Sequence, residues 1–338
     1  MSEKVTLVTG GTGFIGGHLV DHLVSTGRPV RIMAQPQRID EIEDHNLKRY
    51  KEQHQDVVVC DLRDAATIPP ALEGVDCVYH LAAISRPMDV DKKTYYDINV
   101  DGTRNLMEAC REVELRRLVH VSTVSVLGVS PDGRPLKEDD FQHETMDYGL
   151  SKREGERVAL RYHAEHGLPV AVIRPPLMYG PGCIVRSVMF RAVNAGFFPL
   201  FGGGHARMEL CYVENLVQAL TLAETNDRAV GDVFNITDGQ SYEIREVIRA
   251  IQKHLEKKHL LTWMPLPLAY VMGYAMELAA KVFGFYPPFS RTAAAWLSRD
   301  MNVYDCAKAK QVLGYAPAVS LDEGVRRTVA WYKEYGIL

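Results

Sequence analysis

The sequence predicts an α/β protein built on a doubly wound parallel sheet, with a smaller C-terminal lobe. Two observations support this prediction. Through the first half of the 338 residues, short apolar runs alternate with amphipathic segments of helical period, which is typical of parallel strands joined by crossover helices. The first apolar run also leads directly into a glycine-rich turn, and ligands of such sheets bind where the strands end.

The turn after the first strand has the glycine spacing of a dinucleotide-binding site. Residues 4–9 form the apolar strand, Gly10, Gly13 and Gly16 follow it, and an amphipathic helix comes next. In such a turn the first glycine permits a tight bend, the second lets backbone amides approach a pyrophosphate, and the third lets the helix pack against the strand. The anion would lie at the positive end of the helix, so we expect a Rossmann-type dinucleotide site.

The remaining elements follow from the same alternation of patterns. Strands are predicted at 4–9, 29–33, 56–60, 75–81, 116–122 and 169–174, with helices at 14–26, 38–52, 64–73, 93–112 and 148–166. Further helices are predicted at 214–224, 242–256, 268–283 and 321–335. The pattern becomes irregular after Pro175, so we predict two parts. Residues 1–175 would form a dinucleotide-binding core that carries the catalytic residues. Residues 176–338 would form a mixed, mainly substrate-binding lobe, with strands and helices that return to the core.

Tyr148 and Lys152 stand four residues apart in a predicted helix, so both side chains point to one face. A free tyrosine has a pKa near ~10, too high for proton exchange at neutral pH. A nearby ammonium favours the phenolate, so the pair would serve as a general acid–base beside an alcohol or carbonyl. The alternative is an ordinary exposed helix face. A non-catalytic dinucleotide-binding protein on this fold would be expected to lose one of the two residues.

Two hydroxyl residues, Ser122 and Thr123, close the strand predicted at 116–122. A hydroxyl at this edge of a parallel sheet is well placed to hold a substrate oxygen. Serine and threonine are also common in strand-end turns, which is the alternative. Thr123 is the better candidate for a catalytic hydroxyl, and Ser122 is its substitute.

Asp61 and the end of the second strand bear on the nucleotide half of the cofactor. Asp61 follows a strand, where it would accept a hydrogen bond from an adenine amino group or form the N-cap of the next helix. The second strand ends at Ala34-Gln35, without the acidic residue that binds the ribose hydroxyls of NAD. Arg38 is the nearest base, and would meet a 2′-phosphate or be a solvated charge. The missing acidic residue and the nearby Arg38 slightly favour NADP over NAD as the cofactor.

In this order the motifs resemble the extended short-chain dehydrogenase/reductase superfamily, which includes the NAD-dependent epimerase/dehydratase and 3β-hydroxysteroid dehydrogenase-like groups. The resemblance covers nearly the whole chain. It rests on the Gly10–Gly16 turn, Asp61-Leu62, His80-Leu81-Ala82-Ala83, Asn99-Val100-Asp101-Gly102-Thr103, Ser122-Thr123, Tyr148 with Lys152, and Arg174-Pro175-Pro176 running into Tyr179-Gly180-Pro181.

The resemblance implies a role for each site residue. Tyr148 would be the acid–base, Lys152 would hold the nicotinamide ribose, and Thr123 would orient the substrate oxygen. The implied cofactor-binding residues are Gly10, Thr12, Gly13, Phe14, Ile15, Gly16, Arg38, Asp61, Leu62, Leu81, Ala82, Ala83, Asn99, Tyr148, Lys152 and Pro175. Among them, Asp61 and Leu62 would meet the adenine, the 81–83 backbone would line the path to the nicotinamide, Asn99 would organise the site, and the chain from Pro175 would pass the carboxamide. No metal is expected.

We expect an NAD(P)-dependent oxidoreductase that exchanges a hydride with a secondary alcohol or ketone of a sterol-, steroid- or lipid-like substrate. The apolar insertion Trp263–Pro288 resembles that of the 3β-hydroxysteroid dehydrogenase-like group. Six aromatic residues would line an apolar pocket, although each one alone is more readily explained as core. They are Phe197, Phe198, Phe201, Tyr270, Phe283 and Phe285.

The alternative function is a nucleotide-sugar epimerase or dehydratase that uses a retained NAD. By the resemblance, such enzymes carry a phosphate-binding arginine four residues before a Tyr-Val-Asp-like segment. Counting back from Tyr212, that position is Met208, and the arginine is Arg207. A slip of one residue turns a strand side chain to the opposite face, unless a bulge restores it. Arg186 and Arg191 are possible substitutes.

Composition and hydropathy bear on partners and location. The chain is 46% hydrophobic and 24% charged with a formal net charge of −4, which is typical of a soluble globular protein and gives no reason to expect nucleic acid. The first strand begins at Lys4, so no signal peptide is expected. Six scattered cysteines predict buried thiols in a reducing compartment, with the cytoplasm as the default.

Two segments suggest larger partners. Residues 260–276 carry no charge and follow a basic segment. They are expected to form a lobe helix buried on one side, with contact to a membrane surface as the less favoured alternative. The helices near 93–112 and 148–166 resemble those through which relatives pair, so a homodimer is expected.

Overall fold

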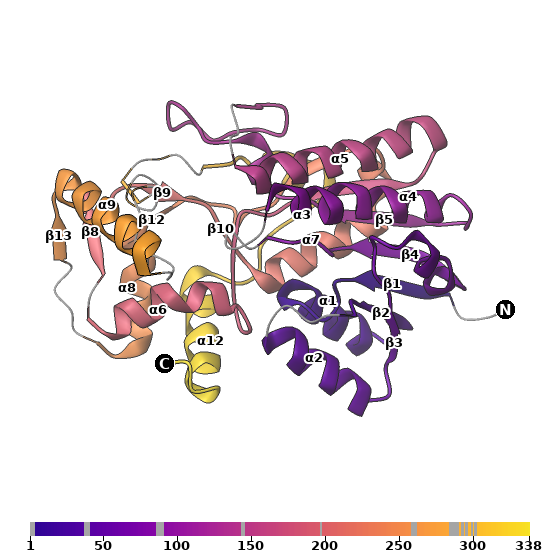
Figure 1. Cartoon of the computed structure of the whole chain (residues 1–338), viewed down its shortest axis with the longest axis horizontal. Helices are drawn as coiled ribbons and strands as arrows, with labels where there is room; N and C mark the ends of the chain where they lie inside the picture. Colours follow the sequence, from indigo (N-terminus) through magenta and orange to yellow (C-terminus); the bar gives the residue numbers. More distant parts are fainter. Residues whose placement is uncertain are drawn as a thin grey trace.

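The computed structural model describes residues 4–36, 41–85, 91–142, 146–196, 198–257, 262–283, 291, 294, 297–298, 300 and 303–338. At its centre is a seven-stranded sheet in the order β11-β6-β5-β4-β1-β2-β3, and every neighbouring pair in it is parallel (Figure 1). The strands are β1 (Val5–Thr9), β2 (Val30–Ala34), β3 (Asp56–Val59), β4 (Val75–His80), β5 (Arg117–Val121), β6 (Val170–Arg174) and β11 (Val233–Asn235). This confirms the predicted fold class and the six predicted strands.

Helices cover both faces of the sheet (Figure 1). On one face lie α4 (Thr103–Cys110) and α5 (Asp147–His166), which share a core with the strands through Leu106 and Val158. On the other face lie α1 (Phe14–Ser25), α2 (Glu41–Glu52), α7 (Val213–Thr225) and α11 (Ala307–Leu313). Their apolar side chains pack on the sheet, so both of its faces are buried, as parallel sheets require.

Two predicted helices differ in the structure. The segment 64–73 forms two short 3₁₀ turns, η1 (Ala65–Thr67) and η2 (Pro69–Leu72), because two consecutive prolines remove the amide donors that an α-helix needs. The segment 93–112 is divided into α3 (Lys92–Tyr96), a π-helical turn η3 (Asp97–Gly102) and α4. π-helical turns are frequent at functional sites.

The second half of the chain forms the lobe and also completes the core. α6 (Ser187–Asn194), α8 (Ile244–Leu255) and α12 (Leu321–Glu334) pack around one apolar cluster. The second half of the chain also forms three two-stranded sheets. They pair β7 (Leu177–Tyr179) with β10 (Leu210–Tyr212), β9 (Arg207–Met208) with β12 (Tyr242–Glu243), and β8 (Pro199–Phe201) with β13 (Thr262–Met264). β11, α7 and α11 return to the sheet. The boundary predicted at Pro175 remains a prediction.

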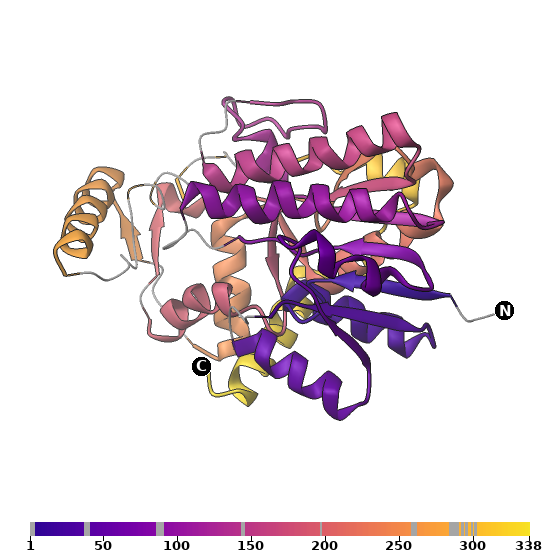
Figure 2. The same cartoon turned by 45° about the vertical axis from the view of Figure 1, so that its right-hand side comes forward.

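α9 (Leu266–Phe283) is the outermost helix of the lobe and projects away from the sheet in both views (Figures 1 and 2). Its buried face, with Ala269, packs on Phe201 and Met264. Among the helices that the structure describes, none is both long and apolar enough to cross a bilayer.

Candidate active site

The glycine-rich turn lies between β1 and α1, and two of its glycines are required by close backbone contacts. Gly10 has a φ of 67°, which favours glycine, and a Cβ on it would lie 2.9 Å from the backbone nitrogen of Ala82. A Cβ on Gly16 would overlap the carbonyl of Gly10. No side chain caps α1 at Gly13, so the amides of its first turn are available to a pyrophosphate. These residues fit the predicted cofactor.

Asp61 and Leu62 follow β3 at the same edge of the sheet. The carboxylate of Asp61 accepts hydrogen bonds from the side chain and backbone of Arg63, and this guanidinium lowers the pKa of Asp61. The N-cap of η1 is Asp64, whose carboxylate accepts from the amide of Ala66. The alternative of Asp61 as the N-cap is therefore wrong, because Asp64 holds that position. Contact with an adenine remains a prediction.

At the end of β2, the side-chain amide of Gln35 donates to the carboxylate of Glu43 over 3.2 Å. An acidic group is thus held near this strand end. It comes from α2, so the sequence at the end of β2 does not reveal it. Arg38 lies outside the described residues. Its role towards a 2′-phosphate remains a prediction.

The structure brings together Thr123, Tyr148 and Lys152, the three predicted catalytic residues. Tyr148 and Lys152 lie one turn apart near the start of α5, and Thr123 follows the end of β5. The hydroxyl of Thr123 lies beside that of Tyr148, close enough to act on its pKa. The ammonium of Lys152 is 3% exposed and donates to the carbonyl of Val121 over 2.8 Å.

Burial dominates the electrostatics of this group. It lowers the pKa of Lys152 to about 8 and raises the pKa of Tyr148 to about 12, although the hydroxyl of Thr123 acts in the opposite direction. The sequence predicted a lowered pKa for Tyr148. That prediction is wrong for the chain alone, because loss of water disfavours the phenolate.

The choice between the two strand-end hydroxyls is also informed by geometry. The hydroxyl of Ser122 is buried and has no hydrogen-bond partner in the described parts of the chain. That of Thr123 contacts Tyr148, accepts from the amide of Ser125 over 3.2 Å and donates to its hydroxyl over 3.3 Å. This geometry favours Thr123 over Ser122, and its catalytic role remains a prediction.

Asn99 joins the chain after β4 to α5. Its side-chain oxygen accepts from the amide of Ile84 over 2.9 Å, and its side-chain nitrogen donates to the carbonyl of Ile84 over 3.1 Å and to Ser151 over 3.0 Å. Ser151 in turn donates to the carbonyl of Tyr148 over 2.8 Å. Asn99 thus ties the predicted cofactor-lining segment to the start of the catalytic helix.

A buried ion pair behind the site was not predicted. Glu156, one turn beyond Lys152, accepts two hydrogen bonds from Arg174 at the end of β6, and neither residue is more than 3% exposed. Arg174 also donates to the carbonyl of Glu138 over 2.7 Å. An arginine inside an otherwise apolar strand is the one sequence signal that would have pointed to this pair, because a buried guanidinium needs a carboxylate partner.

The arginines expected to bind a nucleotide-sugar phosphate are largely committed elsewhere. Arg207 donates to Asp300 from its side chain over 2.8 Å and from its backbone over 2.6 Å, and to the carbonyl of Gly133 over 3.3 Å. Arg191 donates to the carbonyl of Ile337 over 3.2 Å. Arg186 ends the turn η5 (Ile184–Arg186). The structure therefore gives little support to a phosphate grip at Arg207.

The predicted aromatic pocket is described only in part. Phe201 is 1% exposed and belongs to the apolar core beside α9, so for this residue the core explanation holds. Phe198 packs on the lobe core, and Tyr270 is half-buried on α9. Phe197, Phe285 and the side chain of Phe283 lie outside the described residues.

One face of α9 is apolar and exposed to solvent. Leu268, Val271, Tyr274 and Leu278 are between 49% and 65% exposed. Their spacing of three or four residues places them on one side of the helix. The apolar composition of the predicted insertion therefore does not arise only from burial in the lobe.

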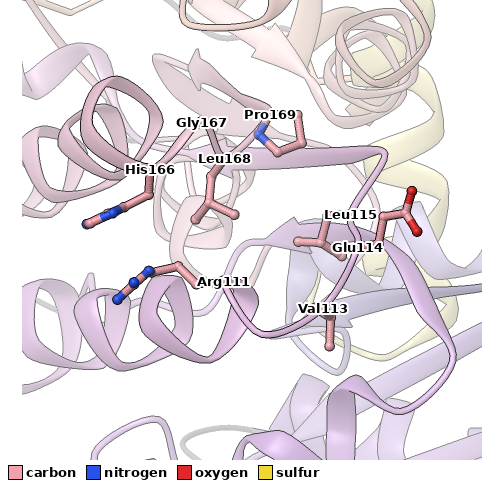
Figure 3. Close-up of a pocket in the computed structure, with 8 residues that line it drawn as sticks. All are labelled: Arg111, Val113, Glu114, Leu115, His166, Gly167, Leu168 and Pro169. Atoms are coloured by element: carbon pink, nitrogen blue, oxygen red, sulfur yellow. The ribbon is translucent and has the colours of Figure 1, made fainter.

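A cavity of about 400 Å³ lies far from this site, between the C-terminal ends of α4 and α5 (Figure 3). It is lined by Arg111, Val113, Glu114, Leu115, His166, Gly167, Leu168 and Pro169. These residues precede β5 and β6, so they lie at the opposite edge of the sheet from the glycine-rich turn. In the part of the chain that the structure describes, no group of three or more His, Cys, Asp or Glu residues has the arrangement of a metal site.

The fold and this site define an extended short-chain dehydrogenase/reductase. The pattern of the NAD dependent epimerase/dehydratase family matches residues 6–237, and the chain belongs to that family. The predicted resemblance is thereby confirmed.

Two named relatives match nearly the whole of this chain. The chain is 30% identical to the 3beta-hydroxysteroid-dehydrogenase/decarboxylase isoform 2 of Arabidopsis thaliana over 97% of its own length, and spans 62% of that relative. It is 28% identical to the sterol-4-alpha-carboxylate 3-dehydrogenase, decarboxylating, of Mus musculus, covering 97% of this chain and 90% of the relative.

Solved structures share the fold over the whole chain. The crystal structure of gox2253 superposes with a TM-score of 0.80 at 27% identity, covering 99% of each chain. The UDP-glucuronic acid 4-epimerase from Bacillus cereus in complex with NAD gives a TM-score of 0.76 at 24% identity, covering 98% of this chain and 99% of the epimerase.

Proposed function

We propose that this protein is an NAD(P)-dependent oxidoreductase that exchanges a hydride with a secondary alcohol or ketone. One observation carries the proposal: Thr123 lies beside Tyr148, and Tyr148 stands one helical turn from the buried ammonium of Lys152. This group lies at the same edge of the sheet as the glycine-rich turn, where parallel sheets bind their ligands.

The residues divide the chemistry among them. When bound, the dinucleotide would accept or donate the hydride, and in its oxidised form it would bring a positive ring that favours the phenolate. Tyr148 takes the proton from the alcohol or returns it to the ketone, and Thr123 orients the same oxygen. Lys152 gives one N–H to Val121 and retains two donors for ribose hydroxyls.

A sterol-, steroid- or lipid-like substrate is the class that the observations support best. The relative from Arabidopsis thaliana is named for a 3beta-hydroxysteroid, and the relative from Mus musculus is named for a sterol-4-alpha-carboxylate. Arg207 is held by Asp300, which weakens the alternative of a nucleotide-sugar epimerase or dehydratase. The lobe that faces the ligand edge of the sheet also carries the apolar α9, at its outer end (Figure 1).

The remaining expectations form part of the same proposal. The lean towards NADP depends on Arg38, and the carboxylate of Glu43 beside Gln35 opposes it. The free, buried state of all six cysteines supports a reducing compartment such as the cytoplasm. The homodimer would form through α4 and α5.

Replacing Tyr148 with phenylalanine tests the mechanism. We expect Tyr148→Phe to lower turnover by roughly 10²–10⁴-fold while the affinity for NADH is retained, because the proton carrier is lost and the ring volume is kept. Tyr162→Phe is the matched control, since Tyr162 lies on the same helix near its other end and donates to Glu108 over 2.8 Å. Unchanged turnover in Tyr148→Phe would remove Tyr148 from the mechanism.

Mass spectrometry of small molecules released from the purified protein separates the two enzyme classes. A dehydrogenase forms reduced cofactor in proportion to the substrate that it converts, and the absorbance of the reduced cofactor records this. It also exchanges its nucleotide freely. An epimerase shows no net change in cofactor and retains NAD. Recovery of tightly bound NAD without net reduction would favour the epimerase.

A further inference from the structure

His80 lies beneath the site and belongs to no predicted catalytic role. It is the last residue of β4 and is 1% exposed. Both of its ring nitrogens are hydrogen-bonded: Nδ1 to the hydroxyl of Thr9 over 2.8 Å, and Nε2 to the hydroxyl of Thr103 over 3.0 Å. A buried imidazole with two partners on two different elements is a fixed part of the structure.

The two hydroxyls determine the direction of these bonds. Thr9 accepts from the amide of Ala82 over 3.1 Å, so its single hydrogen is available to Nδ1 of His80. Thr103 donates to the carbonyl of Asn99 over 2.8 Å, so it accepts from Nε2. Each hydroxyl then donates once and accepts once, which assigns the neutral imidazole with its hydrogen on Nε2. Burial, with the Lys152 ammonium nearby, lowers the pKa of His80 to about 3 and keeps the ring neutral.

The two ends of this hydrogen-bond chain lie where the nicotinamide half of the cofactor is expected. At one end is the backbone of Ala82, which also lies against Gly10 in the glycine-rich turn. At the other end is Asn99, which binds the backbone of Ile84 and the α5 residue Ser151. One imidazole thus connects the end of β1, the segment after β4, and the π-helical turn beneath the catalytic helix.

We propose that His80 is a positioning residue for the nicotinamide half of the cofactor, acting through Thr9 on the Leu81–Ala83 backbone and through Thr103 on Asn99. This inference rests on the cofactor placement in the proposed function. His80 itself touches neither cofactor nor substrate. Its loss would leave two buried hydroxyls short of a partner and let the segment after β4 shift relative to Lys152.

His120 provides a matched control. It pairs with His80 across β4 and β5, its ring centroid lies 5.1 Å from that of His80, and it is 0% exposed. Neither of its ring nitrogens has a hydrogen-bond partner in the described parts of the chain. Replacing His120 with leucine therefore changes a buried ring without breaking a hydrogen-bond chain.

The test compares two nucleotides that differ in the nicotinamide half. NADH binding is followed by nicotinamide fluorescence, and ADP binding is followed by calorimetry. We expect His80→Leu to raise the Kd for NADH about 10-fold, equivalent to about 1.4 kcal/mol, while the Kd for ADP changes by less than about 2-fold. Thr103→Val, which removes one link, should act in the same direction, and His120→Leu should leave the ratio of the two Kd values unchanged.

Each other outcome counts against the inference. Equal losses of NADH and ADP affinity in His80→Leu would show a merely structural role, as would the same nicotinamide-specific loss in His120→Leu. If His80→Leu does not fold, Thr103→Val and His80→Gln, which leave part of the chain in place, carry the same comparison. An unaltered protein that binds neither NADH nor NADPH would overturn the proposed function and this inference together; if it binds only NADPH, the same comparison is made with NADPH and 2′-phospho-ADP. NADH binding with an unchanged ratio in His80→Leu would overturn the inference alone.

Discussion

At the scale of single residues, burial acts in opposite directions on the two main groups of the site. It lowers the pKa of Lys152 to about 8 and raises that of Tyr148 to about 12, because in each case the charged form loses its hydration. The lysine therefore lies close to its titration at physiological pH, whereas the tyrosine alone is too weak an acid. Under the proposed mechanism, the acid–base function would therefore depend on the charge that an oxidised cofactor brings to Tyr148.

Because Lys152 is buried, we expect its replacement by an apolar residue to stabilise the protein to an extent that depends on pH. The pKa of Lys152 falls from its ordinary value of 10.5 to about 8 in the folded protein, so between these values the unfolded chain binds more protons and the folded state gains stability as pH rises. Below pH 8 the full cost of burying the charge is present. We expect Lys152→Met to raise the free energy of unfolding by on the order of 1–3 kcal/mol at pH 7.

Thermal unfolding between pH 7 and pH 10 measures this effect. The advantage of Lys152→Met should shrink as pH rises from 8 towards 10.5, because the lysine of the unaltered protein then becomes neutral. Lys333→Met, at an exposed position on α12, is the control and should show no such trend. A loss of stability that does not vary with pH would contradict the assignment of a burial cost to Lys152.

At the scale of elements, α5 is the helix on which the site depends, and two contacts fix its position. Gly155 faces the π-helical turn η3 so closely that a Cβ would overlap the carbonyl oxygen of Asn99. Glu156, the next residue, is tied to Arg174 at the end of β6. Because Tyr148 and Lys152 lie on the same helix, a displacement of α5 would move both.

Gly155→Ala tests this packing. Within a helix, replacing glycine by alanine ordinarily stabilises a protein by about 0.5–1 kcal/mol. Here the added carbon meets a backbone atom that is itself held by Thr103, so we expect a loss of about 1–3 kcal/mol in urea unfolding and lower turnover. Glu154→Ala, on the outer side of the helix, should change stability by less than about 0.5 kcal/mol. A stabilised Gly155→Ala protein would show that α5 can move away without cost.

At the scale of the whole molecule, the ligand edge of the sheet faces the lobe, and contacts distant in sequence hold the two together. Arg207 of β9 joins Asp300 to the loop at Gly133. Asp238, which follows β11, accepts from the amide of Tyr212 over 2.9 Å. The site is thus bounded by residues from nearly the whole chain.

The outer faces of α4 and α5 determine the kind of dimer that they would form. They carry ion pairs between neighbouring residues of one helix, namely Arg104 with Asp101, Arg111 with Glu108, and Arg157 with Glu154. A homodimer through these helices would have a charged interface, and salt screens exposed charges. We therefore expect sedimentation to show a dimer whose fraction falls as salt is raised. A dimer that is insensitive to salt would place the interface elsewhere.

The sequence predictions were accurate where the structure depends on local sequence patterns, and they failed where it depends on contacts between distant segments. The six predicted strands were located to within about one residue at either end, because strands buried on both faces form continuous apolar runs, and even the half-exposed edge strand β3 carries the run Val57-Val58-Val59. β11 was missed, since three residues are too few to show a pattern. The helix over 93–112 was predicted without its π-helical turn, because that turn meets Gly155 from a segment some fifty residues away.

The sequence by itself determined the fold and the glycine-rich turn, since both depend on local spacing and periodicity, and it predicted Thr123, Tyr148 and Lys152 as the catalytic residues. Only the tertiary structure decided the hydrogen bonds of His80, the pairing of Arg174 with Glu156, the engagement of Arg207 by Asp300 and the direction of the Tyr148 pKa shift. The physical reason is that these depend on burial and on partners from distant segments, which become neighbours only when the chain has folded.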